Sequence, residues 1–369
     1  MKKTLLGFVF LVISLSSMSQ TQTIENSLQQ VLDKSIDKKM VFGTSFAIKK
    51  DTFSWQGASG NISINQAFFI ASTTKLFTAA IILKLRSEGR LNLEDKISKY
   101  IDKSVLAGLH IYKGIDYSQE ISIKHLLSHT SGLPDYFQGK GANGESLEDE
   151  LIKRNDQFWT FEQAMERTKK MKALFAPGTN NKANYSDANF QLLGKIIEII
   201  TGKSYSENCQ YFILQPLGLS HTYLYRDSTD KVPMNLYYKS EELLIPKAMT
   251  SFGPDGGMVS TSEDLLVFIE AFFMGKLFPL AYLEEMQEWN KIFFPMRSGM
   301  GIHLFKLPWI FNPSGAIPYF IGHSGLSGAL AYYSPKEKIF IVGTVNQVAQ
   351  PSLSFKTMVK LTQKLMKMK

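Results

Sequence analysis

The pattern of hydrophobic and polar residues changes twice along the chain. Near the N-terminus, apolar residues recur at helical spacing over 22–40, and the segments 45–48 and 52–55 then predict two strands joined by a tight polar turn. Strand patterns return near the C-terminus, at 329–333 and 339–342. Neither end has enough strands to form a stable sheet alone, so we expect both ends to share one antiparallel sheet.

The middle of the chain has few strand patterns and consists of predicted helices joined by long polar loops. Its clearest helix covers 188–201 and ends at Gly202, a residue type favoured after helix C-termini. We therefore predict an α+β fold, an antiparallel sheet flanked by helices with an inserted all-helical lobe. The expected domains are a sheet domain formed by 20–90 plus 250–369 and a helical domain formed by 91–249.

The first residues have the pattern of a secretory signal peptide. Two lysines follow Met1, an apolar run covers 5–15, and small residues stand at Ser17 and Ser19. This pattern predicts a signal peptide over residues 1–19, and hence a periplasmic or secreted protein. An uncleaved N-terminal anchor is the alternative, although the apolar run is too short to span a membrane.

Composition places the chain among ordinary globular proteins, with 369 residues of which 44% are hydrophobic and 20% charged. The formal net charge of +8 is spread along the chain, so we expect no nucleic-acid partner but a weak attraction to an anionic cell envelope. Cys209 is the only cysteine, which excludes a disulfide framework, and we expect it to be buried. We expect a monomer that binds a small-molecule or peptide substrate.

Ser72 and Lys75 stand at the start of a segment that is apolar nearly all the way round. On a helix the two side chains lie on one face, one turn apart. A Ser that only caps a helix is the alternative, but such a cap prefers Glu or Gln at the position of Lys75. We expect burial and the positive helix end to lower the pKa of Lys75 toward a neutral amine, which would be a base beside a nucleophile.

The spacing of this pair is not specific, because Ser35 and Ser228 are also followed by a lysine three residues later. Those two pairs lie among charged or turn residues, and neither opens a long apolar helix. Context therefore distinguishes Ser72 as the candidate nucleophile.

A Ser-Lys pair also needs a proton relay, donors for an oxyanion and groups that hold the substrate. Tyr185 directly precedes the predicted helix 188–201, which would let its side chain point into a cleft. The glycine-rich segment 322–328, before the late strands, contains His323, Ser324 and Gly325 and would let a substrate approach the backbone closely.

These motifs resemble those of the serine β-lactamase and penicillin-binding protein superfamily, whose first motif is Ser-x-x-Lys. Within it the chain is most similar to the branch with a Tyr-x-Asn second motif, namely class C β-lactamases, D-Ala-D-Ala carboxypeptidases, D-aminopeptidases and related esterases. The segments that carry the resemblance are 72–75, 185–187, 323–325, 126–133 and 255–261.

The resemblance implies a role for each candidate residue and a β-lactamase/transpeptidase-like fold. Ser72 would be the nucleophile, Lys75 would take or relay its proton, and Tyr185 would act as partner base and as acid to the leaving group. The division of labour between Lys75 and Tyr185 stays open. The backbone N–H groups of Ser72 and Leu326 would bind the oxyanion, and His323, Ser324 and Gly325 would face the substrate. No cofactor or metal is implied.

Two residues depart from the family's motifs. Asp187 stands where the family usually has Asn, and an ionised Asp accepts hydrogen bonds but donates none. Asp187 would therefore either favour a substrate amine or hydroxyl, or serve a local turn or an ion pair with Lys75. His323 replaces a lysine, which removes a permanent positive charge. Both departures weaken the case for an efficient β-lactamase.

Two histidines invite other interpretations. His125 and His129 have the spacing of zinc ligands on a helix, but no Glu follows His125, so we read both as structural.

Taken together, these motifs predict an exported serine hydrolase that cleaves an amide or ester, such as a D-amino-acid peptide or a small ester. The alternatives are a β-lactamase proper and a catalytically weak penicillin-binding or sensing module.

Overall fold

The computed structural model describes residues 22–141 and 143–367. The predicted signal peptide, residues 1–19, lies outside the described residues. Within the described part of the chain, no helix combines the length and the apolar character needed to cross a membrane.

The centre of the molecule is an eight-stranded sheet in which every neighbouring pair of strands is antiparallel. The strand order is β10-β11-β12-β13-β14-β15-β1-β2. The N-terminal strand β1 pairs with β15, so that Ala47 faces Val342. The prediction that the two ends of the chain share one antiparallel sheet is confirmed. The strands are β1 (Gly43–Lys50), β2 (Phe53–Gly60), β10 (Asn290–Lys291), β11 (Met296–Ser298), β12 (His303–Phe305), β13 (Phe320–Ser324), β14 (Ala329–Ser334) and β15 (Ile339–Thr344).

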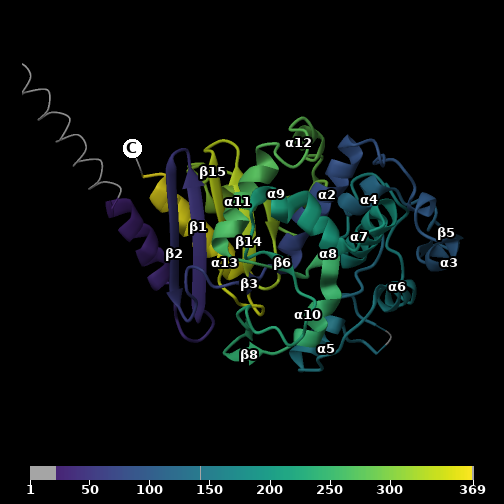
Figure 1. Ribbon diagram of the computed structural model, residues 1–369, viewed down its shortest axis with the longest axis horizontal. Helices are drawn as coiled ribbons and strands as arrows, with labels where there is room; N and C mark the ends of the chain where they lie inside the picture. The colour runs from purple at the N-terminus through teal and green to yellow at the C-terminus, as the bar shows by residue number, and fades with distance from the viewer. Residues whose placement is uncertain (1–21, 142, 368–369) are drawn as a thin grey trace, which may run out of the picture.

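Each face of this sheet packs against helices, because successive side chains of a strand point to opposite faces. On one face, Phe46 and Ile341 join a core with the helix formed by residues 22–33 and with α13 (Ser352–Leu365). On the other, α11 (Ser262–Phe273) packs on β1, β14 and β15, in the larger core. Figure 1 shows α11 and α13 on either side of the sheet.

The larger core continues into the helical part of the molecule, which lies to the right in Figure 1. Its central helices are α2 (Lys75–Ser87), which is buried on almost every side, and α7 (Asp187–Thr201), which packs against it. The other helices are α3 (Lys103–Leu106), α4 (Ile123–Leu127), α5 (Leu147–Ile152), α6 (Phe161–Lys169), α8 (Tyr205–Cys209), α9 (Gln215–Leu217), α10 (Pro246–Phe252) and α12 (Tyr282–Glu285).

Short elements connect these parts. A second sheet has the order β3-β9-β6, and two hairpins are formed by β4 with β5 and by β7 with β8. These strands are β3 (Phe68–Phe69), β4 (Ile111–Tyr112), β5 (Ile115–Asp116), β6 (Tyr223–Leu224), β7 (Leu236–Tyr238), β8 (Glu241–Leu243) and β9 (Met258–Ser260). The tight helical turns are η1 (Ala71–Thr74), η2 (Ile97–Lys99), η3 (Gln210–Leu214), η4 (Gly253–Asp255) and η5 (Trp309–Phe311).

The α+β class is confirmed, but one half of the sheet differs from the sequence-based prediction. Strands β10 to β13 were not predicted, and His323 lies on β13 itself, whereas we expected it in a segment that precedes the strands. The region 91–249 also contains short strands from β4 to β8 that the pattern did not indicate.

Candidate active site

Ser72 lies in η1, a tight turn between β3 and the first residue of α2. Strand β9 fixes this turn, because the Ile70 N–H donates to the Met258 carbonyl at 3.0 Å and the Met258 N–H donates to Thr74 Oγ1 at 3.1 Å. Ala71 has a φ of 45°, a left-handed conformation that costs an L-residue about 1 to 2 kcal/mol. A strained turn held by its neighbours presents Ser72 at the start of the helix.

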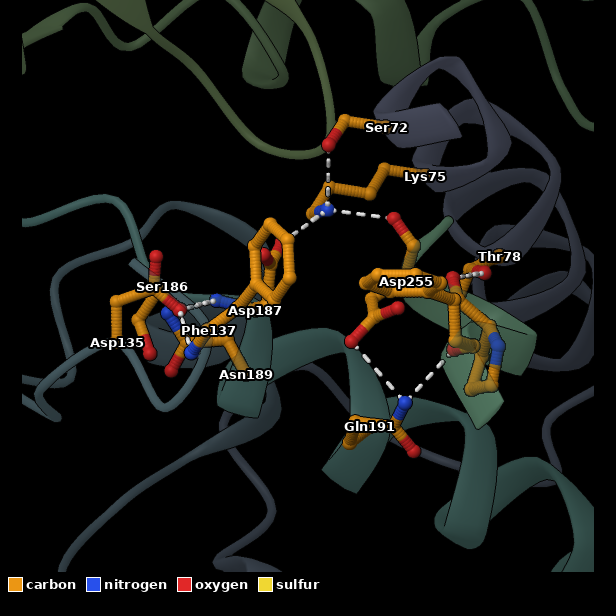
Figure 2. Close-up of polar contacts among 12 residues, drawn as sticks. Ser72, Lys75, Thr78, Asp135, Phe137, Ser186, Asp187, Asn189, Gln191 and Asp255 are labelled. Carbon is orange, nitrogen blue, oxygen red and sulfur yellow. Dashed lines mark hydrogen bonds and ion pairs between the residues drawn. The ribbon is translucent and has the colours of Figure 1, made fainter. Parts of the chain in front are cut away.

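Lys75 is fully buried, and its ammonium group meets three acceptors. Nζ lies 3.2 Å from Ser72 Oγ, 2.5 Å from Asp187 Oδ1 and 2.6 Å from the carbonyl oxygen of Asp255. Figure 2 shows these three contacts around Nζ. An ammonium has three hydrogens to donate, so this arrangement satisfies all of them.

The prediction that Lys75 is a neutral amine is wrong for this state of the protein. Burial lowers the pKa of Lys75 more than any single neighbour raises it, but the charge and hydrogen bond of Asp187 together with the charges of Tyr185 and Asp255 outweigh burial, and the net shift is upward from the ordinary value. Of the interpretations open for Asp187, the structure therefore shows the ion pair with Lys75. The sequence analysis left this ion pair open as one alternative, although the two residues lie 112 positions apart.

Two further carboxyl groups lie beside this ion pair. Asp135 Oδ1 accepts from the backbone N–H of Asp187 at 3.2 Å, and Asp255 Oδ2 accepts from the hydroxyl of Tyr136 at 2.8 Å. Burial, reinforced by the charge of Asp187, raises the pKa of Asp135 to about 7 and that of Asp255 well above its ordinary value. Asp187 is therefore the carboxylate that balances the charge of Lys75.

Asp135 gives a prediction for stability against pH. Since its folded-state pKa of about 7 lies above the ordinary 3.8, its contribution to stability is fully present below about pH 4 and is lost as the pH rises to about 7. We expect Asp135→Asn to stabilise the protein by about 2 kcal/mol at pH 8 and by much less at pH 4. Urea unfolding at both pH values measures this, with Asp33→Asn on the surface as control. An equal effect at both pH values would contradict it.

Tyr185 lies two residues before α7 and is half-buried, with its ring centroid 5.1 Å from Lys75 Nζ. Burial raises the pKa of Tyr185 and the Lys75 charge lowers it, but the net shift is upward, so the side chain is a neutral phenol. Its ring stacks on His129 at 4.6 Å between centroids. His129 Nδ1 accepts from the Ser186 N–H at 3.2 Å and from the Asn189 amide at 3.0 Å. His129 thus holds Tyr185 in place.

His323, Ser324 and Gly325 lie at the end of β13, opposite η1. The ring of His323 stacks on His303 of β12 with centroids 4.0 Å apart. Burial lowers the pKa of His303 to about 3 and that of His323 well below its ordinary value, so both rings are neutral. Neither ring nitrogen of His303 has a hydrogen-bond partner within the described chain. Sequence reasoning missed His303 because it missed strand β12.

Gly325 approaches the nucleophile turn closely. A Cβ at this position would lie 2.4 Å from the Ile70 carbonyl oxygen, 2.8 Å from Ala71 Cβ and 3.1 Å from the backbone nitrogen of Ser72. Gly325→Ala should therefore push β13 away from η1 and lower kcat by about 100-fold, since a displacement of about 1 Å costs that much. Steady-state kinetics check this. Gly141→Ala is the control, because its added methyl would first meet a side-chain oxygen at 3.2 Å.

The candidate residues other than Lys75 line one cavity of about 970 Å³. Lys75 is buried behind Ser72 and does not line it. The cavity wall includes Ser72, Tyr185, Asp187, Asp255, His303, His323, Ser324, Gly325 and Leu326.

Among residues 22–141 and 143–367, no group of His, Cys, Asp and Glu side chains has the arrangement of a metal site. His125 instead completes the N-terminal cap of α4, where its Nδ1 accepts from the Ser122 N–H at 3.2 Å.

Comparisons with known proteins show which proteins this chain resembles. Among curated proteins, the putative penicillin-binding protein PbpX of Bacillus subtilis is 26% identical over 262 residues, which are 69% of this chain and 57% of PbpX. Protein flp of Staphylococcus aureus (strain COL) is 27% identical over 258 residues, 66% of this chain and 48% of that protein. The chain thus spans about half the length of these curated relatives.

Solved structures show the same fold. A D-amino acid amidase from Ochrobactrum anthropi SV3 superposes with a TM-score of 0.77 at 20% identity, covering 93% of this chain and 98% of the amidase. EstCE1, a hydrolase with promiscuous acyltransferase activity, gives a TM-score of 0.74 at 20% identity, covering 94% of this chain and 99% of EstCE1. The sequence model of the Beta-lactamase family matches residues 29–359, and the chain therefore belongs to the beta-lactamase family.

Proposed function

We propose that this protein is an exported serine hydrolase that forms an acyl-enzyme on Ser72 and cleaves an ester or amide. The observation that carries the proposal is the 3.2 Å contact between Ser72 Oγ and Lys75 Nζ at the wall of a cavity that Tyr185 and His323 also line. The fold shared with an amidase and with EstCE1 supports this chemistry.

The proton of Ser72 needs an acceptor that the resting state does not offer. Lys75 is an ammonium with all its hydrogens bound, and Tyr185 is a neutral phenol. Transfer of one proton from Lys75 Nζ to Asp187 Oδ1, across 2.5 Å, leaves a neutral amine beside Ser72. That amine takes the hydroxyl proton as Oγ attacks the substrate carbonyl. Asp187 then serves as the proton store of the site.

The later steps use the remaining residues. The backbone N–H groups of Ser72 and Leu326 stabilise the oxyanion of the tetrahedral intermediate. The phenol of Tyr185 protonates the leaving alcohol or amine, and the Lys75 ammonium restores the proton to Tyr185. Water then attacks the ester on Ser72 and gives up a proton to the Lys75 amine. The resulting ammonium protonates Ser72 Oγ as the acid is released, and Asp187 returns its proton to Lys75.

The charges of the site bear on the substrate. The Asp187 carboxylate is already paired with Lys75 and is only 5% exposed, so it is a poor partner for a substrate amine. His323 is neutral, and so gives a substrate carboxylate no positive partner. We therefore favour an ester, or an amide without a free charge near the scissile bond, over a D-amino acid amide, a D-Ala-D-Ala peptide or a β-lactam.

An acylating probe tests the nucleophile. A fluorophosphonate should label the wild-type protein, and Ser72→Ala should abolish labelling and lower ester hydrolysis by a factor on the order of 10⁴ or more. Ser87→Ala, at the exposed end of α2, is the control and should label normally. Labelling that survives Ser72→Ala would refute the assignment.

Substrate class and export need their own measurements. Hydrolysis of a p-nitrophenyl ester, a D-aminoacyl amide, a D-Ala-D-Ala peptide and a cephalosporin by one preparation ranks the candidates. An amide or cephalosporin that is turned over faster than the ester would overturn the preference for an ester.

Export predicts a mature N-terminus near Gln20 in protein recovered from outside the cytoplasm, and an N-terminus at Met1 would contradict cleavage.

A further inference from the structure

The cavity extends beyond the catalytic residues along one face of α13. Its wall on this helix is formed by Ser352, Phe355, Lys356, Val359, Lys360 and Gln363. These positions recur every three or four residues, so they form one stripe on the helix. From the first to the last, the stripe extends for about 16 Å at 1.5 Å per residue. The cavity therefore has a long arm in addition to the space beside Ser72.

The opposite wall of this arm is apolar. It is formed by residues from β11, β12 and the segment that follows them, namely Met296, Phe305, Leu307 and Phe311. Phe305 stacks on Phe355 of α13 with centroids 4.9 Å apart, which joins the two walls at one point. Four residues supply the polar groups of the α13 stripe, and all four are exposed, namely Ser352, Lys356, Lys360 and Gln363. A ligand in the arm would thus contact mainly carbon.

The mouth of the cavity is apolar as well. Phe294 and Phe311 both line the cavity, yet their side chains are 79% and 68% exposed. Trp309 and Ile310, which precede Phe311 in η5, are exposed to a similar degree. Large apolar side chains that gather at the entrance to a site indicate that the ligand itself is apolar.

We propose that the arm along α13 binds a long unbranched aliphatic chain of the substrate, so that the substrate is an ester or amide of an amphiphile. This inference deepens the proposed function and rests on it. The chain lies beside the stacked Phe305–Phe355 pair, with Val359 on one side and Leu307 and Phe311 on the other, while the scissile carbonyl reaches Ser72. Either the acyl group or the alcohol can carry the chain, and separate substrate series distinguish them.

The proposal predicts how the rate depends on chain length. Each methylene transferred from water into an apolar site strengthens binding about fourfold. For the wild-type enzyme, kcat/KM should therefore rise about fourfold per methylene until the arm is filled, and then level off. Two series are compared, p-nitrophenyl esters from acetyl to dodecanoyl and acetate esters from ethanol to dodecanol. A rate that is flat or falls with chain length in both series would overturn the proposal.

A substitution in the arm provides the second measurement. Val359→Trp should fill part of the arm and lower the ratio of long-chain to short-chain kcat/KM by about tenfold or more. The matched control is Val267→Trp, because Val267 is 41% exposed on α11 and does not line the cavity. The control should keep the wild-type ratio. Equal ratios in the two variants would also overturn the proposal.

Binding without catalysis separates this proposal from the proposed function. Calorimetric titration of dodecanoate and of butanoate into the Ser72→Ala protein should give detectable affinity for dodecanoate, which Val359→Trp on the same background removes. If dodecanoate binds in this way while no substrate is hydrolysed through Ser72, the aliphatic binding site in the arm is supported and the proposed hydrolase function is refuted. If Ser72-dependent hydrolysis is found but dodecanoate binds no better than butanoate, the binding site in the arm is refuted and the hydrolase function is supported.

Discussion

Lys75→Met is expected to abolish acylation of Ser72 and to lower the free energy of unfolding by about 3 to 5 kcal/mol. Methionine keeps most of the length of the side chain but removes the ammonium, so Asp187 loses its partner while only 5% exposed, and the Asp255 carbonyl loses a donor. An uncompensated buried charge causes the loss of stability, and the missing proton acceptor causes the loss of acylation. Urea unfolding and fluorophosphonate labelling measure the two effects.

The double variant Lys75→Met/Asp187→Asn distinguishes the ion pair from simple packing. Because the pair is then uncharged, the double variant should recover at least about 1 kcal/mol of the unfolding free energy lost in the single variant. Lys84→Met, on the exposed side of α2, is the matched control and should change stability by no more than about 0.5 kcal/mol. A Lys75→Met protein as stable as the control would show that Asp187 does not depend on Lys75.

Asp187→Asn is expected to move the rising limb of the pH profile of kcat/KM to lower pH. Asp187 raises the pKa of Lys75, and it also acts to raise that of Tyr185, which burial already raises. Removing the carboxylate therefore lowers the pKa of whichever of the two groups accepts the Ser72 proton. The expected displacement is about 1 to 3 pH units, the usual effect of a neighbouring opposite charge.

The pH profile is measured with one activated ester, so that the leaving group needs little help from an acid. Asp51→Asn, in the exposed turn between β1 and β2, is the matched control and should leave the profile unchanged. A rising limb that stays in place, or one that moves to higher pH, would exclude Asp187 as the group that sets the protonation of the site. A fall in activity without any displacement would assign Asp187 an orienting role only.

The sequence predicted the longer elements of this fold well, for a physical reason. The helix 188–201 and the strands 329–333 and 339–342 are long enough to show several repeats of their hydrophobic period. Strands β10 to β12 have two or three residues each, so no alternation can develop in them. Their pairing is determined by neighbouring strands, and three of the eight strands were missed for that reason.

The candidate site was predictable only in part. Ser72 and Lys75 could be found because they are adjacent on one helix turn, and Tyr185 and His323 because they belong to motifs. The charge state of Lys75 was predicted wrongly, because it depends on Asp187, which approaches only in the folded chain. His303 belongs to no motif and lies on an unpredicted strand, so neither pattern nor resemblance could identify it.

The pairing of β1 with β15 also constrains how the chain acquires its structure. The Thr44 hydroxyl donates to the carbonyl oxygen of Thr344, 300 positions later. Strand β1 therefore cannot pair with β15 until nearly the whole chain has been synthesised. Until β15 emerges, one edge of the β1–β2 hairpin has no ladder partner and is open to association with other chains. Closing so long a loop is slow, and synthesis must be almost finished before the sheet can form. A chain that stops before residue 339 would therefore be prone to aggregation rather than partly active.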